Sequence, residues 1–109
     1  MNSEIKTINR KDSDLNYYRI NVNFEVVKCM RPNVLGNPNV LKSEDARDEN
    51  IAQFKQYLWK KMQSDNPVSR ELTRLATCEK VVVLVCCCKP KACHTDVIKA
   101  AIEWMRKNK

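Results

Sequence analysis

Glycine, proline, histidine and aromatic residues are all scarce in this chain. Its 109 residues include one glycine, four prolines and one histidine, and 6% are aromatic. This composition excludes collagen-like and low-complexity chains, and it offers little of the aromatic platform on which single-stranded nucleic acids stack. The longest uncharged apolar run, Val81 to Cys88, is too short to cross a bilayer. No apolar segment opens the sequence, so we expect neither a signal peptide nor a membrane partner, but a cytoplasmic protein.

The apolar content of 43% is sufficient for one hydrophobic core. We expect a polar, irregular arm over residues 1–16 and a single domain over residues 17–109. The chain has six cysteines, and four of them lie between residues 86 and 93. Such clustering, without an export signal, indicates reduced thiols rather than a disulfide framework.

The formal charge of +7 has two interpretations. Lysines and arginines are spread along the chain, which is typical of a solvated basic surface. The same excess would attract phosphates, either in nucleotides or in nucleic acid. The sequence leaves both interpretations open.

Apolar periodicity in the first two thirds of the chain predicts a strand and two helices. Tyr18, Ile20, Val22 and Phe24 alternate with polar residues, as in a half-buried strand, and residues 25–29 extend it or form a second short piece. Residues 31–39 contain two prolines and the only glycine, so they form a loop. A helix with Ile51, Phe54 and Leu58 on its apolar face, capped by Ser43 or Asp45, should run to about residue 62. Asn66 followed by Pro67 predicts the start of a second helix.

The last third of the chain predicts a strand followed by a helix. Residues 80–85 contain a run of β-branched valines, which is typical of a central, parallel strand buried on both faces. A helix from about Ala92 to Arg106 follows, with Ile98 and Ile102 in its core-facing stripe. The fold class is therefore α/β: one compact domain of two or three layers, with a short, mainly parallel sheet and flanking helices.

The cysteine-rich loop after this strand is the main candidate site. Strand alternation places Cys86 and Cys88 on one face and Cys87 on the other. Cys86, Cys88, Cys93 and His94 could converge as a zinc site, although their spacing is unusual for zinc. The alternative, which the strand position favours, is that Cys86 and Cys88 pack as small hydrophobes and no cofactor is bound.

Cys93, His94 and Asp96 at the helix start are the candidate catalytic residues. A thiol near a helix N-terminus should have a lowered pKa, and an adjacent imidazole can exchange its proton. Asp96 would cap the helix or hold His94 in one tautomer. In the alternative interpretation, His94 is a helix-start residue bonded to the backbone. The N–H groups there also attract anions.

These motifs resemble the domain of unknown function 4326 family, small α/β proteins of bacteria, archaea and phages. The family pattern contains a valine–asparagine strand, a loop ending in G-N-P, an arginine-led helix ending in Y-x-x-Y-L, and a strand running into C-x-C-x-P-x-x-C-H-G-D-V-L. The matching positions here are Val22-Asn23, the loop from Arg31 to Pro38, Arg47 with Gln56-Tyr57-Leu58, and Cys86, Cys88, Pro90, Cys93, His94, Asp96 and Val97. Met30 and Thr95 stand where the family has glycines.

The resemblance implies that both polar loops lie at one edge of the sheet, and it marks Arg31, Gly36, Asn37 and Arg47 as ligand-binding candidates. We expect binding, and processing by hydrolysis or transfer, of an anionic, nucleotide-like small molecule. The sequence does not decide whether a reaction takes place. Two alternatives stay open: a zinc-stabilised interaction module, and a basic phage accessory protein that binds nucleic acid or a host protein without catalysis. A phage protein would act in the host cytoplasm.

Overall fold

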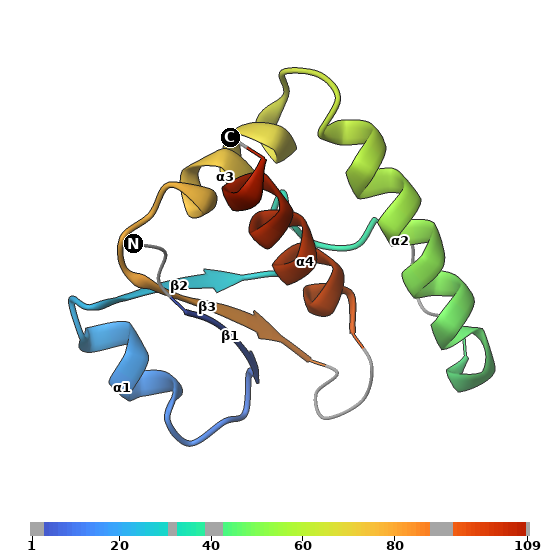
Figure 1. Ribbon diagram of the computed structural model, residues 1–109. Coiled ribbons are helices and arrows are strands. Elements are labelled where there is room, and N and C mark those ends of the chain that lie inside the picture. The colour runs from blue at the N-terminus through green and yellow to red at the C-terminus, as the bar shows by residue number, and fades with distance from the viewer. Residues whose placement is uncertain (1–3, 31–32, 39–42, 88–92, 109) are drawn as a thin grey trace.

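The computed structural model describes residues 4–30, 33–38, 43–87 and 93–108 (Figure 1). Helices and strands alternate along most of the chain. Their order is β1 (Ile5–Asn9), α1 (Leu15–Ile20), β2 (Phe24–Lys28), the 3-10 turn η1 (Glu44–Ala46), α2 (Arg47–Lys61), α3 (Pro67–Ala76), β3 (Val81–Cys86) and α4 (His94–Lys107). Within these ranges, no helix is both long and apolar enough to cross a membrane.

The three strands of the described residues form one parallel sheet in the order β1-β3-β2. Ile5 pairs with Val82 in one ladder, and Phe24 pairs with Val81 in the other. The central, parallel position predicted for the β-branched run is confirmed. A strand that is covered on both faces must satisfy its backbone groups through neighbours on both edges, and β3 does so.

The sheet is the middle one of three layers. Val82 and Leu84 face the core formed with α2, α3 and α4, whereas Val83 and Val85 face Leu15 of α1. Figure 1 shows α1 on the opposite side of the sheet from α3 and α4. The connection through α1 runs from β1 to β2, and the connection through α2 and α3 runs back from β2 to the central strand β3. Right-handed connections in opposite directions require opposite faces, so the α/β fold class is confirmed in its three-layer form.

The strand predicted over Tyr18 to Phe24 is wrong in its first part. Residues 15–20 are helical, and the strand begins only at Phe24. Leu15 and Tyr18, three residues apart, contact the sheet, while Ile20 and Val22 are 82% and 78% exposed. The alternation therefore did not reflect alternating burial. The side chain of Asn21 accepts a hydrogen bond from Asn23 N–H, in the turn between helix and strand.

The irregular arm predicted over residues 1–16 is also corrected. Ile5–Asn9 forms β1, and α1 begins at Leu15. Ile5 is 4% exposed, and the strand pairs with β3 along its length. Polar residues can occupy an edge strand because only part of its surface is buried. The polar composition therefore led to the wrong prediction that this segment is irregular.

The three longer helices follow the predicted pattern, with one corrected cap. Asn66 caps α3 and exchanges hydrogen bonds with Ser69, and Pro67 is the first helical residue. Neither Ser43 nor Asp45 caps α2, whose N-cap position is Ala46 after the η1 turn. Arg106 of α4 donates from Nε to the carbonyl of Ala76, 3.1 Å away, and so satisfies an end of α3.

Candidate functional site

The carboxyl ends of the three strands lie at one edge of the sheet. Asn9 pairs with Cys86 across β1 and β3, and Lys28 pairs with Val85 across β2 and β3. Cys29, the residue after β2, donates its N–H to the Val85 carbonyl over 2.9 Å. In open α/β sheets this edge is where ligands bind. The loop after each strand therefore starts at the place where a site is expected.

His94 is the first residue of α4, and both of its ring nitrogens have partners. Nε2 makes a short contact to the backbone carbonyl of Cys29, and Nδ1 lies 3.5 Å from Cys93 Sγ. The ring packs edge-on against Phe54 of α2, with centroids 5.1 Å apart. The predicted alternative was a histidine at the helix start that is bonded to the backbone, and the position and contact of His94 confirm it. The same contact brings the loop after β2 and the start of α4 together.

The partners of His94 determine its tautomer. A backbone carbonyl can only accept, so the neutral ring carries its proton on Nε2 and leaves the Nδ1 lone pair towards Cys93. Burial lowers the pKa of His94, and the Cys29 carbonyl opposes that shift only in part. The ring is therefore neutral near pH 7. A thiol, a neutral base and a third group that orients the base form an arrangement suited to nucleophilic catalysis.

Cys93 and Asp96 close the first turn of α4. The N–H of Asp96 donates to the Cys93 carbonyl, and Asp96 Oδ2 lies 3.4 Å from the Cys93 N–H. Cys93 is 1% exposed. Asp96 thus faces the backbone at the helix start, as a capping carboxylate does. The group that is seen to fix the His94 tautomer is the Cys29 carbonyl.

Thr95 is not among the site residues predicted from the sequence. It stands where the family pattern has glycine, and it is fully buried. Its Oγ1 has no hydrogen-bond partner among the residues that the structure describes. A buried hydroxyl without a partner costs about 1–3 kcal/mol. This hydroxyl lies in the first turn of α4, in the residue that follows the Cys93–His94 pair.

The other buried thiols, Cys29 and Cys86, lie at the ends of β2 and β3. Cys86 is fully buried at the end of β3, as the packing interpretation predicts, while Cys87 is exposed. Burial raises the pKa of the Cys29 thiol well above its usual range, and the nearby thiols of Cys93 and Cys86 add to this shift. Cys88 lies outside the described residues. Within those residues, no three histidine, cysteine, aspartate or glutamate side chains are placed to share a metal ion, and the four-ligand zinc set stays a hypothesis.

The described part of the loop before α2 is tied to the core. Leu35 is fully buried, and Asn33 accepts hydrogen bonds from Leu35 N–H through Oδ1 and from Gly36 N–H through its backbone carbonyl. Asn37 donates from Nδ2 to Asn50 Oδ1 of α2 over 2.7 Å. The structure therefore shows Asn37 as an anchor for its loop. A role in ligand binding stays a prediction.

The predicted arginines are placed only in part. Arg47, at the first position of α2, makes a two-point ion pair with Glu44, with distances of 2.9 and 3.0 Å. Its side chain is 15% exposed. Arg31, like Lys89 and Lys91, lies outside the described residues. Cys93, His94 and Asp96 are thus brought together, whereas Arg47 is seen bound to its own helix start.

Two features of the site carry no side-chain signature in the sequence. The Cys29 contribution is a backbone carbonyl, which every residue has, and only the fold brings it to His94. Phe54 has the spacing of an ordinary core residue.

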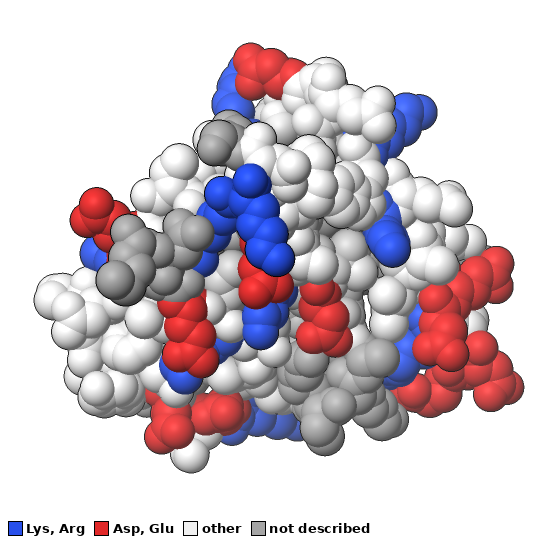
Figure 2. Space-filling model, viewed as in Figure 1, with Lys and Arg blue, Asp and Glu red and all other residues white. Residues whose placement is uncertain are grey.

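The positive charge is not gathered into one patch on the face seen in Figure 2. Lysines and arginines are interspersed with acidic residues there. Nucleic-acid binding stays a prediction.

The comparisons with known proteins agree with the resemblance. The family described as "Domain of unknown function (DUF4326)" matches residues 14–104, and the chain belongs to this family. No curated protein and no solved structure matches the chain. The match includes α1 and all the residues around His94, and it begins after β1.

Proposed function

We propose that this chain binds an anionic, nucleotide-like small molecule where the strands end and α4 begins, and processes it as a hydrolase or transferase. The carrying observation is the aligned set of Cys93 Sγ, His94 and the Cys29 carbonyl. The N–H groups of the first turn of α4 supply partial positive charge for a phosphate or carboxylate. Thr95 Oγ1, which has no hydrogen-bond partner among the described residues, would supply a hydrogen-bonding atom at the same turn.

The chemistry follows from the tautomer. Cys93 passes its Sγ proton to the unprotonated Nδ1 of His94, and the resulting thiolate attacks the electrophilic atom of the substrate. The bond from that atom to the leaving group breaks, and the His94 imidazolium returns the proton to the leaving group. Water or a second substrate then releases the product from Cys93. The Cys29 carbonyl holds the ring throughout, because it accepts the Nε2 proton in both charge states of the ring.

Arg31 and Arg47 complete the proposal as the residues that hold anionic oxygens. A planar guanidinium makes two parallel hydrogen bonds to a phosphate or carboxylate. Arg47 already makes such a pair with Glu44, so a bound phosphate would take the place of that carboxylate. Arg31 is assigned on its sequence position alone.

The test is a thermal-shift panel of nucleotides, nucleotide sugars and sugar phosphates, with inorganic phosphate as the reference anion. We expect at least one compound to raise the Tm, and the shift to shrink in Thr95→Val and Arg47→Ala. Thr77→Val is the matched control, since Thr77 is exposed at the end of α3. Turnover of the compound that binds should be lost in Cys93→Ser and His94→Gln. If no compound shifts the wild-type Tm, the proposal is wrong.

Zinc is the rival to this ligand, because the sequence offers Cys86, Cys88, Cys93 and His94 as a ligand set between the end of β3 and the start of α4. Elemental analysis of the purified protein separates the two hypotheses. Zinc near one equivalent, lost in Cys93→Ser, would replace the catalytic proposal with a metal-stabilised interaction module.

A further inference from the structure

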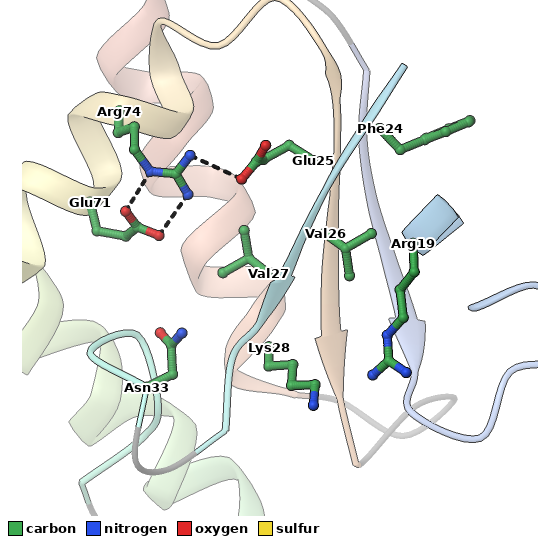
Figure 3. A pocket seen from close by; sticks show the side chains of 9 residues that line it. All are labelled: Arg19, Phe24, Glu25, Val26, Val27, Lys28, Asn33, Glu71 and Arg74. Carbon is green, nitrogen blue, oxygen red and sulfur yellow. Dashed lines mark hydrogen bonds and ion pairs between the residues drawn. The ribbon is translucent and has the colours of Figure 1, made fainter. Parts of the chain in front are cut away.

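A groove of about 550 Å³ runs along the open edge of β2, apart from the His94 site. Its lining comes from α1, from β2 itself, from Asn33 and from α3 (Figure 3). Strand β2 pairs with β3 on one side only, and the described residues provide no strand on the other. The groove is thus formed around a sheet edge that can still accept a neighbour.

The backbone of β2 presents alternate groups to that edge. Asn23 accepts from Val81 N–H, and Cys29 donates to the Val85 carbonyl, so odd-numbered residues face β3. By alternation, the N–H and C=O of Val26 and Lys28 face outwards. Such unpaired groups act as a template for an added strand unless the edge is blunted. Neither proline nor glycine interrupts Phe24–Lys28.

Charged side chains line the groove unequally. Arg74 of α3 is held by Glu71 at 2.7 Å and by Glu25 at 3.0 Å, so along one wall both carboxylates are paired with the same guanidinium and the three groups carry a net charge of about −1. Arg19 and Lys28 make no ion pair with any residue that the structure describes. Figure 3 shows both of them extending towards the same end of the groove. The groove therefore carries unneutralised positive charge at the carboxyl end of β2.

Apolar side chains extend this surface beyond the groove. Ile20 is 82% exposed, Val22 is 78% exposed and Tyr17 is 56% exposed, all in α1 or in the turn that leads into β2. Exposed apolar residues beside an open strand edge are typical of a surface that contacts another protein. This surface contacts a polypeptide better than a small molecule, because it continues along the strand for several residues.

We propose that the open edge of β2 binds an extended acidic segment of another protein as an added strand. Charge complementarity identifies the occupant: Arg19 and Lys28 attract carboxylates, and the chain as a whole carries +7. A second copy of this chain would bring the same positive charge to the same edge. The added strand follows the β-augmentation mode, in which main-chain hydrogen bonds give affinity and alternate side chains give specificity.

The geometry also defines the pattern of the segment. Side chains of the added strand that lie beside Val26 and Lys28 face the unpaired cations, so these positions should be aspartate or glutamate. The alternate positions of the added strand lie beside Glu25 and Val27, where the Glu25 carboxylate is already paired with Arg74. They should be β-branched. The segment is therefore one in which acidic and β-branched residues alternate.

The probe is a fluorescein-labelled peptide of alternating glutamate and valine, measured by fluorescence anisotropy with the full chain. Its controls are a lysine–valine peptide and the same glutamate–valine peptide with alternate backbone amides N-methylated. We expect Arg19→Glu with Lys28→Glu to weaken binding by about tenfold or more, through lost pairing and new repulsion. Lys55→Glu with Lys107→Glu changes the net charge equally, at exposed positions outside the groove, and should have a much smaller effect.

Val26→Pro tests the strand edge itself. The Val26 N–H faces outwards, so proline removes a donor to the peptide without removing one to β3. The proposal is overturned if the N-methylated peptide binds as well as its parent, or if the two charge-reversed variants bind alike. It is also overturned if sedimentation shows a wild-type dimer that Arg19→Glu with Lys28→Glu disrupts, because the edge would then belong to a second copy. These tests do not involve the Cys93–His94 site, so each proposal can fail alone.

Discussion

His94 Nε2 contacts the backbone carbonyl of Cys29, 65 residues earlier in the chain. The contact joins the end of β2 to the first residue of α4, and it leaves the other ring nitrogen towards Cys93 Sγ. It also explains how a buried imidazole is tolerated, because the neutral ring has a partner for its only N–H. The position, tautomer and charge of His94 thus all depend on one tertiary contact.

The tautomer can be observed directly, because His94 is the only histidine of the chain. Long-range ¹H–¹⁵N correlation should show a protonated Nε2 and an unprotonated Nδ1 near pH 7. In Cys93→Ser the same tautomer should persist, since the Cys29 carbonyl is untouched. A protonated Nδ1 would contradict both the geometry and the proposed role of His94 as a base.

The stability of the protein should depend on pH through His94. Burial lowers the folded-state pKa of His94, so below about pH 6.5 the unfolded chain binds the proton more readily. The free energy of unfolding should therefore fall as the pH decreases from about 7 to 5, by up to about 1.4 kcal/mol for each unit of pKa shift. Above this range the contribution is constant.

Urea titrations at several pH values measure this dependence. His94→Gln is the control, because its amide can still donate to the Cys29 carbonyl but does not titrate. The difference between wild type and His94→Gln should change with pH only between about 5 and 7. Parallel curves for the two proteins would show that His94 is not responsible.

Thr95→Val should stabilise the unliganded protein. Valine has nearly the same shape as threonine but removes the buried hydroxyl that has no partner in the described residues. We expect a gain of about 1 kcal/mol, the lower end of the cost of an unsatisfied buried group. Urea unfolding of Thr95→Val and Thr95→Ser measures it. A loss of stability in Thr95→Val, with Thr95→Ser unchanged, would show that the hydroxyl is already satisfied.

The hydrogen bond between Asn37 and Asn50 should hold the loop before α2. Asn37→Ala and Asn50→Ala should each lose about 1 kcal/mol of stability, and the double variant should lose less than their sum. A double-mutant cycle in urea measures the coupling, which we expect to be about 0.5–1.5 kcal/mol. Strict additivity of the two losses would contradict the contact.

The thiols should differ in reactivity according to their burial. Iodoacetamide should modify Cys87, which is exposed, well before Cys29, which is buried and has a raised pKa. Modification of Cys29 should stay slow when the pH is raised from 7 to 9, because burial raises its pKa. Peptide mapping by mass spectrometry resolves the two sites. Equal rates in the native protein, as expected in guanidinium chloride, would contradict the packing around His94.

The sequence alone determined the elements that depend on uniform burial or on local hydrogen bonds. The β-branched run at 81–85 could only be a strand covered on both faces, and Asn66-Pro67 specified the start of α3 through local hydrogen bonding and a fixed φ. It also determined the candidate residues Cys93, His94 and Asp96, because adjacent positions at a helix start are together in any fold.

Tertiary structure decided everything that depends on a distant partner. The residues of β1 are too polar to predict a strand, and they form one because β3 needs a neighbour on its second edge. Ile20 and Val22 alternate like strand residues, yet they are exposed, since packing of Leu15 and Tyr18 on the sheet favours the helix. The Cys29 carbonyl reaches His94 only because the fold brings the residue after β2 next to the start of α4. Backbone groups and burial carry no side-chain signature, and for this reason the sequence located half of the site and the fold supplied the other half.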